Sequence, residues 1–354
     1  MLFGRSRGLV GLDIGDSSIK VIELKEHKGG WQVHKLGWEP LSSEAIVDGA
    51  IMDSQLVSEI IQRLFERCRI KSSSPVSIAL SGHSVIVKRI SLPVMSEAEL
   101  AESIRWEAEQ YIPFDIEDVN LDYMILEGSS LAGEGNMDVL LAAAKKEKIN
   151  DYINVINQAG LNAATVDIAA FAMQNAFEAN YDFEPDQVIA LVDIGAAVSS
   201  ITVLYGGTSV YWRDINIGGN QYTDAIQKEM NLSGEHAEML KRGEEVEDIQ
   251  YEQVLPILAS VNDDIGKEIQ KTLDFFKQIS ATDRALDRAY LCGGTSQVQH
   301  VKESLSERLD AEVELLNPFR KVTPAGRDAT PELINEMMPT ASVAVGLGLR
   351  KVGD

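Results

Sequence analysis

Two stretches of the chain share one pattern of hydrophobic and polar positions, and they lie 180 residues apart. In residues 11–38 and again in 191–215, an apolar run ends in Asp-x-Gly, and two alternating runs separated by a Gly-Gly pair follow. Alternation rich in β-branched and aromatic residues predicts strands, and Gly-Gly between such runs is typical of a hairpin turn. A repeat at half the chain length predicts two related lobes rather than a solenoid, whose units recur every ~20–50 residues.

A separate α/β unit interrupts the first lobe at residues 83–165. It begins with an alternating strand that Pro93 ends, and Ser96 with Glu99 then forms a capping box that predicts the start of a helix. The pattern predicts its remaining elements at 119–126 and 139–144 (strands) and at 146–159 (helix). Elsewhere we expect a helix at 54–68, capped by Asp53, and an acidic helical region at 222–279. Two further helices are expected at 166–177 and 297–309.

These patterns predict an α/β fold of two lobes divided into four subdomains. The expected boundaries are 1–82 with 166–190 and 340–354 for the core of lobe one, 83–165 for the insert, 191–212 with 285–339 for the core of lobe two, and 213–284 for a helical subdomain.

Composition narrows the classes of function. The chain has 354 residues, of which 45% are hydrophobic, and a net charge of −23, which argues against binding nucleic acid or anionic lipid. Cys68 and Cys292 lie far apart and give no disulfide framework, as expected in a reducing cytosol. We expect no signal peptide, because Asp13 interrupts any apolar run near the start. We also expect no membrane insertion, because the apolar stretch 341–349 is far shorter than the ~18 residues of a spanning helix.

The two Asp-x-Gly turns are candidate phosphate sites. Their small residues expose backbone N–H groups that bind phosphate oxygens, an Asp before each turn suits a hydrated Mg²⁺, and Lys20 supplies a point charge. A third loop at the expected start of helix 297–309 would seat a ribose or an α-phosphate at the positive helix end. One such turn is common, but three loops together favour a nucleotide site, whose candidates are Asp13, Gly15, Asp16, Ser17, Ser18, Lys20, Asp193, Gly195, Ala196, Gly293, Gly294, Thr295 and Ser296.

This arrangement resembles the actin superfamily, in which ATP lies between two lobes. Asp13–Gly15 and Asp193–Gly195 resemble its two phosphate loops, Leu291–Ser296 its adenosine loop, and the turn with Gly218 and Gly219 a loop of bacterial actins. Glu238, Lys241 and Arg242 resemble residues that contact adenine and ribose, although they also suit a solvated charged helix face. The resemblance implies ATP with Mg²⁺, which Asp13 and Asp193 would hold through water.

The size and placement of the insert resemble the arrangement in FtsA, with its relocated 1C subdomain. The run Trp106–Phe114, together with Leu2-Phe3-Gly4 and Val10–Gly15, resembles the PilM family of type IV pilus assembly proteins. This resemblance implies an ATP-binding cytoplasmic protein, peripheral to the inner membrane, that binds the N-terminal segment of PilN in a groove between subdomains 1A and 1C. It implies indirect links to PilO and PilP and, as a further possibility, contact with the pilus motor ATPases.

Two positions depart from the hydrolytic pattern of actin. Ala196 and Ala197 stand where actin has an acidic residue and a glycine. Asp167 is the closest match to the water-positioning residue, and it is either a base or water-orienting group or a helix N-cap. The catalytic candidates implied by the resemblance are Asp167 and Asp193. We therefore expect ATP binding with weak or no hydrolysis.

The insert helix is the predicted partner surface. Leu100, Ile104, Ala108 and Tyr111 share one face, whereas Trp106 points away from it. Trp106 is either covered by another element or part of a binding surface, together with Tyr111 and Phe114, and the acidic residues of the helix suit a basic partner segment or water. The rival functions are an actin-superfamily kinase of a small molecule and a filament-forming division scaffold.

Overall fold

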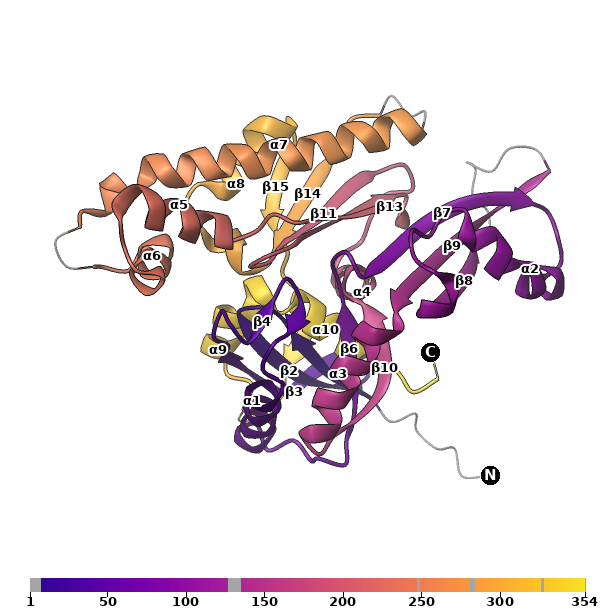
Figure 1. The fold of residues 1–354 in the computed structure, drawn as a ribbon, viewed down its shortest axis with the longest axis horizontal. Coiled ribbons are helices and arrows are strands. Elements are labelled where there is room, and N and C mark those ends of the chain that lie inside the picture. The colour runs from indigo at the N-terminus through magenta and orange to yellow at the C-terminus, as the bar shows by residue number, and fades with distance from the viewer. Residues whose placement is uncertain (1–7, 127–134, 247–248, 281–283, 326–327, 354) are drawn as a thin grey trace.

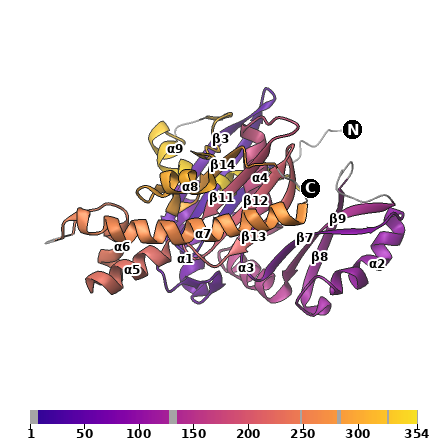
Figure 2. The same cartoon turned by 90° about the horizontal axis from the view of Figure 1, so that it is seen from above.

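The two duplicated hairpins form the centres of two separate sheets, one in each lobe (Figure 1). The computed structural model describes residues 8–126, 135–246, 249–280, 284–325 and 328–353; the sequence motif Leu2-Phe3-Gly4 lies outside these ranges. The insert and the helices α5 and α6 project at opposite ends of the longest axis, and the long helix α7 runs over the second lobe (Figures 1 and 2).

The first lobe has a six-stranded sheet between helical layers. Its strand order is β10-β6-β1-β2-β3-β16, with bounds Val10–Ile14 (β1), Ser18–His27 (β2), Gly30–Pro40 (β3), Pro75–Leu80 (β6), Asn162–Ile168 (β10) and Val322–Pro324 (β16). One face packs on helices α1 (Ser54–Arg67) and α3 (Lys146–Gln158), and the other on α4 (Ala169–Asn180), α9 (Pro331–Met337) and α10 (Ser342–Leu349). The predicted cap of α1 is confirmed, because the Asp53 side chain accepts a hydrogen bond from the N–H of Leu56.

The second lobe repeats this plan with five strands. The order is β13-β12-β11-β14-β15, with bounds Val188–Ile194 (β11), Ser199–Tyr205 (β12), Thr208–Ile215 (β13), Arg288–Cys292 (β14) and Glu312–Leu315 (β15). One face packs on helices α5 (Asn220–Met230), α6 (Gly234–Lys241), α7 (Leu255–Ser280) and α8 (Val301–Leu309).

Helix α4 lies between the two sheets. Ala172 and Ala176 pack in the clusters of lobe one, whereas Met173 and Phe177 pack against β11 and β14 of lobe two. Its sequence is apolar on almost every side because both faces are buried, as expected for a helix inside the core.

The insert is a three-stranded antiparallel sheet covered by one helix. The order is β7-β9-β8, with β7 at Val85–Pro93, β8 at Val119–Leu126, β9 at Asn136–Lys145 and helix α2 at Glu97–Glu109. Ser96 and Glu99 form the predicted capping box, and Leu100, Ile104 and Ala108 are buried against the sheet. Short elements complete the chain: β4 (Ile46–Val47), β5 (Ala50–Ile51) and 3₁₀ turns at Ile116–Asp118, Tyr251–Gln253, Gly294–Gln297 and Met338–Thr340.

Three sequence expectations differ from the structure. Residues 166–168 belong to strand β10, which pairs with β6, so that helix α4 begins only at Ala169. The helix expected from 297 begins at Val301, because Val298 is extended and His300 is left-handed with φ 63°. Strand β16 pairs with β3 of lobe one, although the sequence analysis grouped it with lobe two. In the described part of the chain, every helix is too short or too polar to cross a bilayer.

Candidate functional site

The two Asp-x-Gly turns have the same geometry. Asp13 pairs with Lys20 across the first hairpin, and Asp193 pairs with Ser200 at the same register of the second. In each turn the glycine N–H donates to the carbonyl three residues on, at 3.1 Å from Gly15 and 3.0 Å from Gly195. The duplication predicted from the sequence is therefore confirmed down to single hydrogen bonds.

The lobe-one turn is electrostatically satisfied. Lys20 Nζ lies 3.0 Å from Asp13 Oδ2, and both side chains are largely buried. Asp16 accepts a hydrogen bond of 3.0 Å from the N–H of Gly49, at the tip of the β4–β5 hairpin. Burial raises the pKa of Asp16, and the Gly49 hydrogen bond opposes that shift. Ser17 and Ser18 complete the turn, with the Ser17 carbonyl accepting from the N–H of Leu41.

The lobe-two turn carries an unbalanced acid. Burial raises the pKa of Asp193 to about 6, the Asp13 carboxylate adds to the shift, and Lys20 opposes it. Asp13, Lys20 and Asp193 therefore act on one another across the boundary between the lobes. Two carboxylates that share one ammonium leave a net negative charge, which a cation would neutralise.

Two further loops pack on the lobe-two turn. The N–H groups of Gly219 and Asn220 donate to the carbonyls of Gly195 and Ala196, at 2.9 and 2.8 Å, and the Thr295 hydroxyl donates to the Gly195 carbonyl at 2.8 Å. A Cβ on Gly219 would stand 2.6 Å from the Thr295 hydroxyl, so this close approach requires glycine. Gly218 and Gly293 are equally crowded, by the carbonyls of Ala196 and Ile194 respectively.

A charged cluster on α6 reaches the same place. Lys241 Nζ lies 2.5 Å from Glu238 Oε2 and 3.3 Å from the Gly219 carbonyl, while Arg242 Nε lies 3.1 Å from Glu238 Oε1. Burial would raise the pKa of Glu238, but the neighbouring Lys241, Thr223 and Arg242 bring it below its ordinary value. The predicted adenine and ribose contacts thus lie beside the predicted phosphate and adenosine loops.

These residues fit a nucleotide with a hydrated magnesium ion. A Cβ on Gly294 would meet no atom within 4 Å, so the adenosine loop faces open space, whereas its neighbours are tightly packed. Asp13 and Asp193 are the hard oxygen donors that Mg²⁺ prefers, and two carboxylates suit an ion that keeps several waters. In the described ranges, no group of three or more His, Cys, Asp or Glu is placed to hold a metal directly.

The structure places Asp167 differently from its expected role. It lies at the end of β10, where its Oδ2 forms an ion pair of 2.7 Å with Arg350 Nε, and its Oδ1 accepts from the N–H of Ile168. The N-cap position of α4 is Ile168, so Asp167 is not that cap. A carboxylate held by a guanidinium is a poor general base.

Two residues beside the turns, Asp214 and Lys148, are not predicted from the sequence. Asp214 of β13 pairs with Ser200, which pairs with Asp193, so the register of the duplicated hairpin was a usable signal. Lys148 of α3 donates to the Gly49 carbonyl beside Asp16, but these residues come from distant segments and no local pattern connects them.

The three predicted partner residues have different environments. Trp106 is 72% exposed on α2, so no other element of the described structure covers it. Tyr111 and Phe114 pack on the insert core, with Lys88 Nζ 5.0 Å and Lys145 Nζ 4.4 Å from their ring centroids. Phe114 also lines a cavity of about 320 Å³ with Asp115, Asp118, Lys145, Lys146 and Glu147, where the insert meets lobe one.

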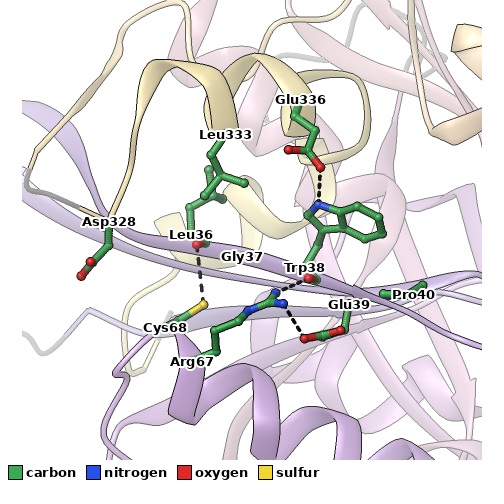
Figure 3. A pocket seen from close by; sticks show the side chains of 10 residues that line it. All are labelled: Leu36, Gly37, Trp38, Glu39, Pro40, Arg67, Cys68, Asp328, Leu333 and Glu336. Atoms are coloured by element: carbon green, nitrogen blue, oxygen red, sulfur yellow. Dashed lines mark hydrogen bonds and ion pairs between the residues drawn. The ribbon is translucent and has the colours of Figure 1, made fainter.

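A larger pocket of about 460 Å³ lies elsewhere, between β3, the end of α1 and α9 (Figure 3). Trp38 Nε1 donates to Glu336 at 2.8 Å, and Arg67 contacts both the Trp38 carbonyl and Glu39. The polar groups of this pocket are already paired, Asp328 with Lys35 outside the pocket and the others with one another, and none of the predicted nucleotide-binding residues lines it.

Comparisons with known proteins agree with this geometry. The sequence model of the family described as "Type IV pilus assembly protein PilM" matches residues 11–352. A solved structure, the PilM-PilN type IV pilus biogenesis complex, is similar with a TM-score of 0.87 and 30% identity, over 99% of this chain and 100% of that one. The cell division protein FtsA of Streptococcus pneumoniae is 23% identical over 95% of this chain and 74% of its own length. MreB 5 of Spiroplasma citri bound to AMPPNP shares the fold, with a TM-score of 0.53 and 12% identity over 97% of this chain and 95% of that one.

Proposed function

Because the chain belongs to the family of type IV pilus assembly protein PilM and has a two-lobed actin-like fold, we propose that it is an ATP-binding scaffold on the cytoplasmic side of the pilus assembly complex. Its partner would be the N-terminal cytoplasmic segment of a PilN-like protein, which links it indirectly to PilO and PilP, and the pilus motor ATPases are a further candidate partner. The observation that carries the proposal is the similarity to a chain of the PilM-PilN complex, over 99% of this chain and 100% of that one.

The convergence of four loops and helix α6 supports nucleotide binding. The turns at Gly15 and Gly195 would bind phosphate oxygens through backbone N–H groups, and Asp13 with Asp193 would hold Mg²⁺ through water. The loops at Gly219 and Gly294, with α6, would enclose the ribose and base. When bound, the nucleotide supplies negative phosphates and a metal ion that neutralise this charge pattern and join the lobes.

The residues around the turns favour slow hydrolysis. Ala196 and Ala197 offer no side chain to orient a water, and Asp167 is already paired with Arg350. The role proposed for ATP is therefore structural, as a bridge between the lobes.

The nucleotide test is thermal unfolding of the purified protein with and without Mg-ATP. A ligand at ~100 times Kd stabilises by about 2.7 kcal/mol, so we expect a clear rise in Tm. Asp13→Ala should abolish the rise, while Asp53→Ala, which changes a helix cap away from the turns, should retain it. Equal Tm values with and without Mg-ATP, in protein shown by acid extraction to carry no nucleotide, would contradict ATP binding.

The partner site is proposed to lie on the insert. Exposed Trp106 is a typical interface anchor. Phe114, which follows it closely in the sequence, lines the cavity at the junction with lobe one. Fluorescence anisotropy of a labelled peptide with the N-terminal residues of the PilN-like protein tests this. Trp106→Ala and Phe114→Ala should each weaken binding at least tenfold, about 1.4 kcal/mol, and Phe275→Ala, an exposed aromatic on α7, should not. Unchanged affinity in both insert variants would remove the insert as the partner site.

A further inference from the structure

The insert joins lobe one through two adjacent connections. The chain enters through the turn 81–84 between β6 and β7, and it leaves through 145–148, where β9 runs into α3. The N–H of Lys145 donates to the Ser84 carbonyl at 3.0 Å, so the two connections are hydrogen-bonded to each other. We call residues 81–84 and 145–148 the neck. Because every backbone connection to the insert passes through the neck, a displacement of the neck moves the insert.

The neck contacts lobe two beside the lobe-two turn. The N–H of Gly82 donates to Asp214 Oδ2 at 2.6 Å, and Gly82 is buried. Asp214 stands opposite Ser200, which stands opposite Asp193, so these three residues form one row across β13, β12 and β11. Val198 of the turn also faces the neck, because a Cβ on Gly82 would lie 3.8 Å from Val198 Cγ2.

The neck is joined to the lobe-one turn through Gly49. Lys148 Nζ and the Tyr152 hydroxyl both donate to the Gly49 carbonyl, the latter at 3.1 Å. The N–H of Gly49 in turn donates to Asp16 of the turn at 3.0 Å. The two turns belong to different lobes, yet each is joined to the same neck by hydrogen bonds.

We propose that Asp214 is a positioning residue that transmits the state of the nucleotide cleft to the insert. A ligand that draws Asp13 and Asp193 together shifts one turn relative to the other. The neck is hydrogen-bonded beside both turns. It therefore either moves with the shifted turn or loses one of its two contacts, and either change reorients the insert. The inference rests on the proposed function, and it names the residues through which cleft and partner surface are coupled.

Another cross-lobe contact of β13 provides a control. Ser209 donates to Gln174 of α4, so it also joins the lobes from the same strand, but it does not touch the neck. A role for Asp214 in lobe adhesion alone predicts that Asp214→Ala and Ser209→Ala behave alike. A role in coupling predicts that only the first uncouples the insert.

The experiment measures peptide affinity and amide hydrogen exchange of residues 85–93 and 136–145 with and without Mg-ATP. In the wild type we expect Mg-ATP to change peptide affinity at least fivefold and to alter exchange in both segments. Asp214→Ala should retain the Mg-ATP-induced rise in Tm but reduce the change in affinity below about twofold. Asp214→Asn, which still accepts from the Gly82 N–H, and Ser209→Ala should keep the wild-type response.

The outcomes separate the two proposals. Absence of any Tm rise in the wild type overturns ATP binding and the coupling with it. A Tm rise without any change in the insert, or wild-type coupling in Asp214→Ala, overturns the coupling alone. If Asp214→Ala does not fold, Lys148→Met decides: it removes the lobe-one contact of the neck and should also lower the coupling, and an undiminished response contradicts the proposal.

Discussion

The two halves of the cleft are built on one hairpin plan but carry different chemistry. In lobe one the row across the strands reads Asp13, Lys20 and Trp38, and in lobe two it reads Asp193, Ser200 and Asp214. The first row is neutralised by its own ion pair. The second has two acids around a hydroxyl, and burial raises the pKa of both. The same backbone thus supports a satisfied half and a half that favours an external cation.

This difference assigns a separate task to each lobe. The Lys20 ammonium keeps the lobe-one turn folded without a ligand, because it compensates Asp13 from within the protein. Lobe two gains that compensation at Asp193 from a bound cation, while its second acid, Asp214, faces the insert neck. The following four predictions test the contrast, beginning with the largest effect.

Removal of the lobe-one cation should have the largest effect. Lys20→Met leaves Asp13 beside Asp193 with no compensating charge, and loss of one partner of a buried pair costs about 3–5 kcal/mol. Chemical denaturation should show a lower free energy of unfolding by about that amount. Lys25→Met, on the exposed part of the same strand, should change it by less than about 0.5 kcal/mol. Similar losses in both variants would mean that Lys20 is not the compensating charge.

Neutralising Asp193, the acid of the lobe-two turn, should raise the free energy of unfolding, whereas loss of Lys20 lowers it. The folded-state pKa of Asp193, about 6, exceeds its ordinary 3.8. The protonated carboxyl of Asp193 therefore adds to the free energy of unfolding in full below about pH 4, and this contribution is lost as pH rises through about 6. At pH 7.5, Asp193→Asn should stabilise the nucleotide-free protein by about 1–3 kcal/mol while removing the Tm rise with Mg-ATP. Denaturation of both proteins from pH 4.5 to 7.5 should show this difference growing with pH; a constant difference would contradict the assignment.

Part of the contrast between the two lobes could be predicted from the sequence. The repeat spacing predicted both turns and their register, because hairpin geometry follows from the alternation and from short turns. It did not predict Lys148 near Asp16, nor Arg350 on Asp167, because each contact joins segments that only the tertiary fold brings together. The helix expected at 166–177 was wrong in its first turn, since β-branched Val166 and Ile168 extend a strand paired with β6.

The adenosine loop offers a smaller and purely local test. Gly294→Ala adds a Cβ where no atom lies within 4 Å, so the nucleotide-free protein should unfold within about 0.5 kcal/mol of the wild type. If the ribose or base fills that space, Kd for ATP should rise roughly tenfold. Titration calorimetry gives Kd. The matched control is Gly30→Ala at the first residue of β3, where an added Cβ would meet the His27 carbonyl at 3.8 Å. A wild-type Kd would show that the nucleotide does not approach Gly294.

The smallest effect is expected at Asp167. Its carboxylate is buried and paired with Arg350 rather than aimed at a water, so Asp167→Asn should alter ATP turnover by less than about twofold. Turnover itself should stay well below the ~1 s⁻¹ of ordinary enzymes, as measured by phosphate release. The variant should still lose about 1–2 kcal/mol of stability, because the guanidinium keeps only a neutral acceptor. A faster wild type that Asp167→Asn abolishes would instead make lobe one the catalytic half, and ATP would then be a substrate rather than a bridge between the lobes.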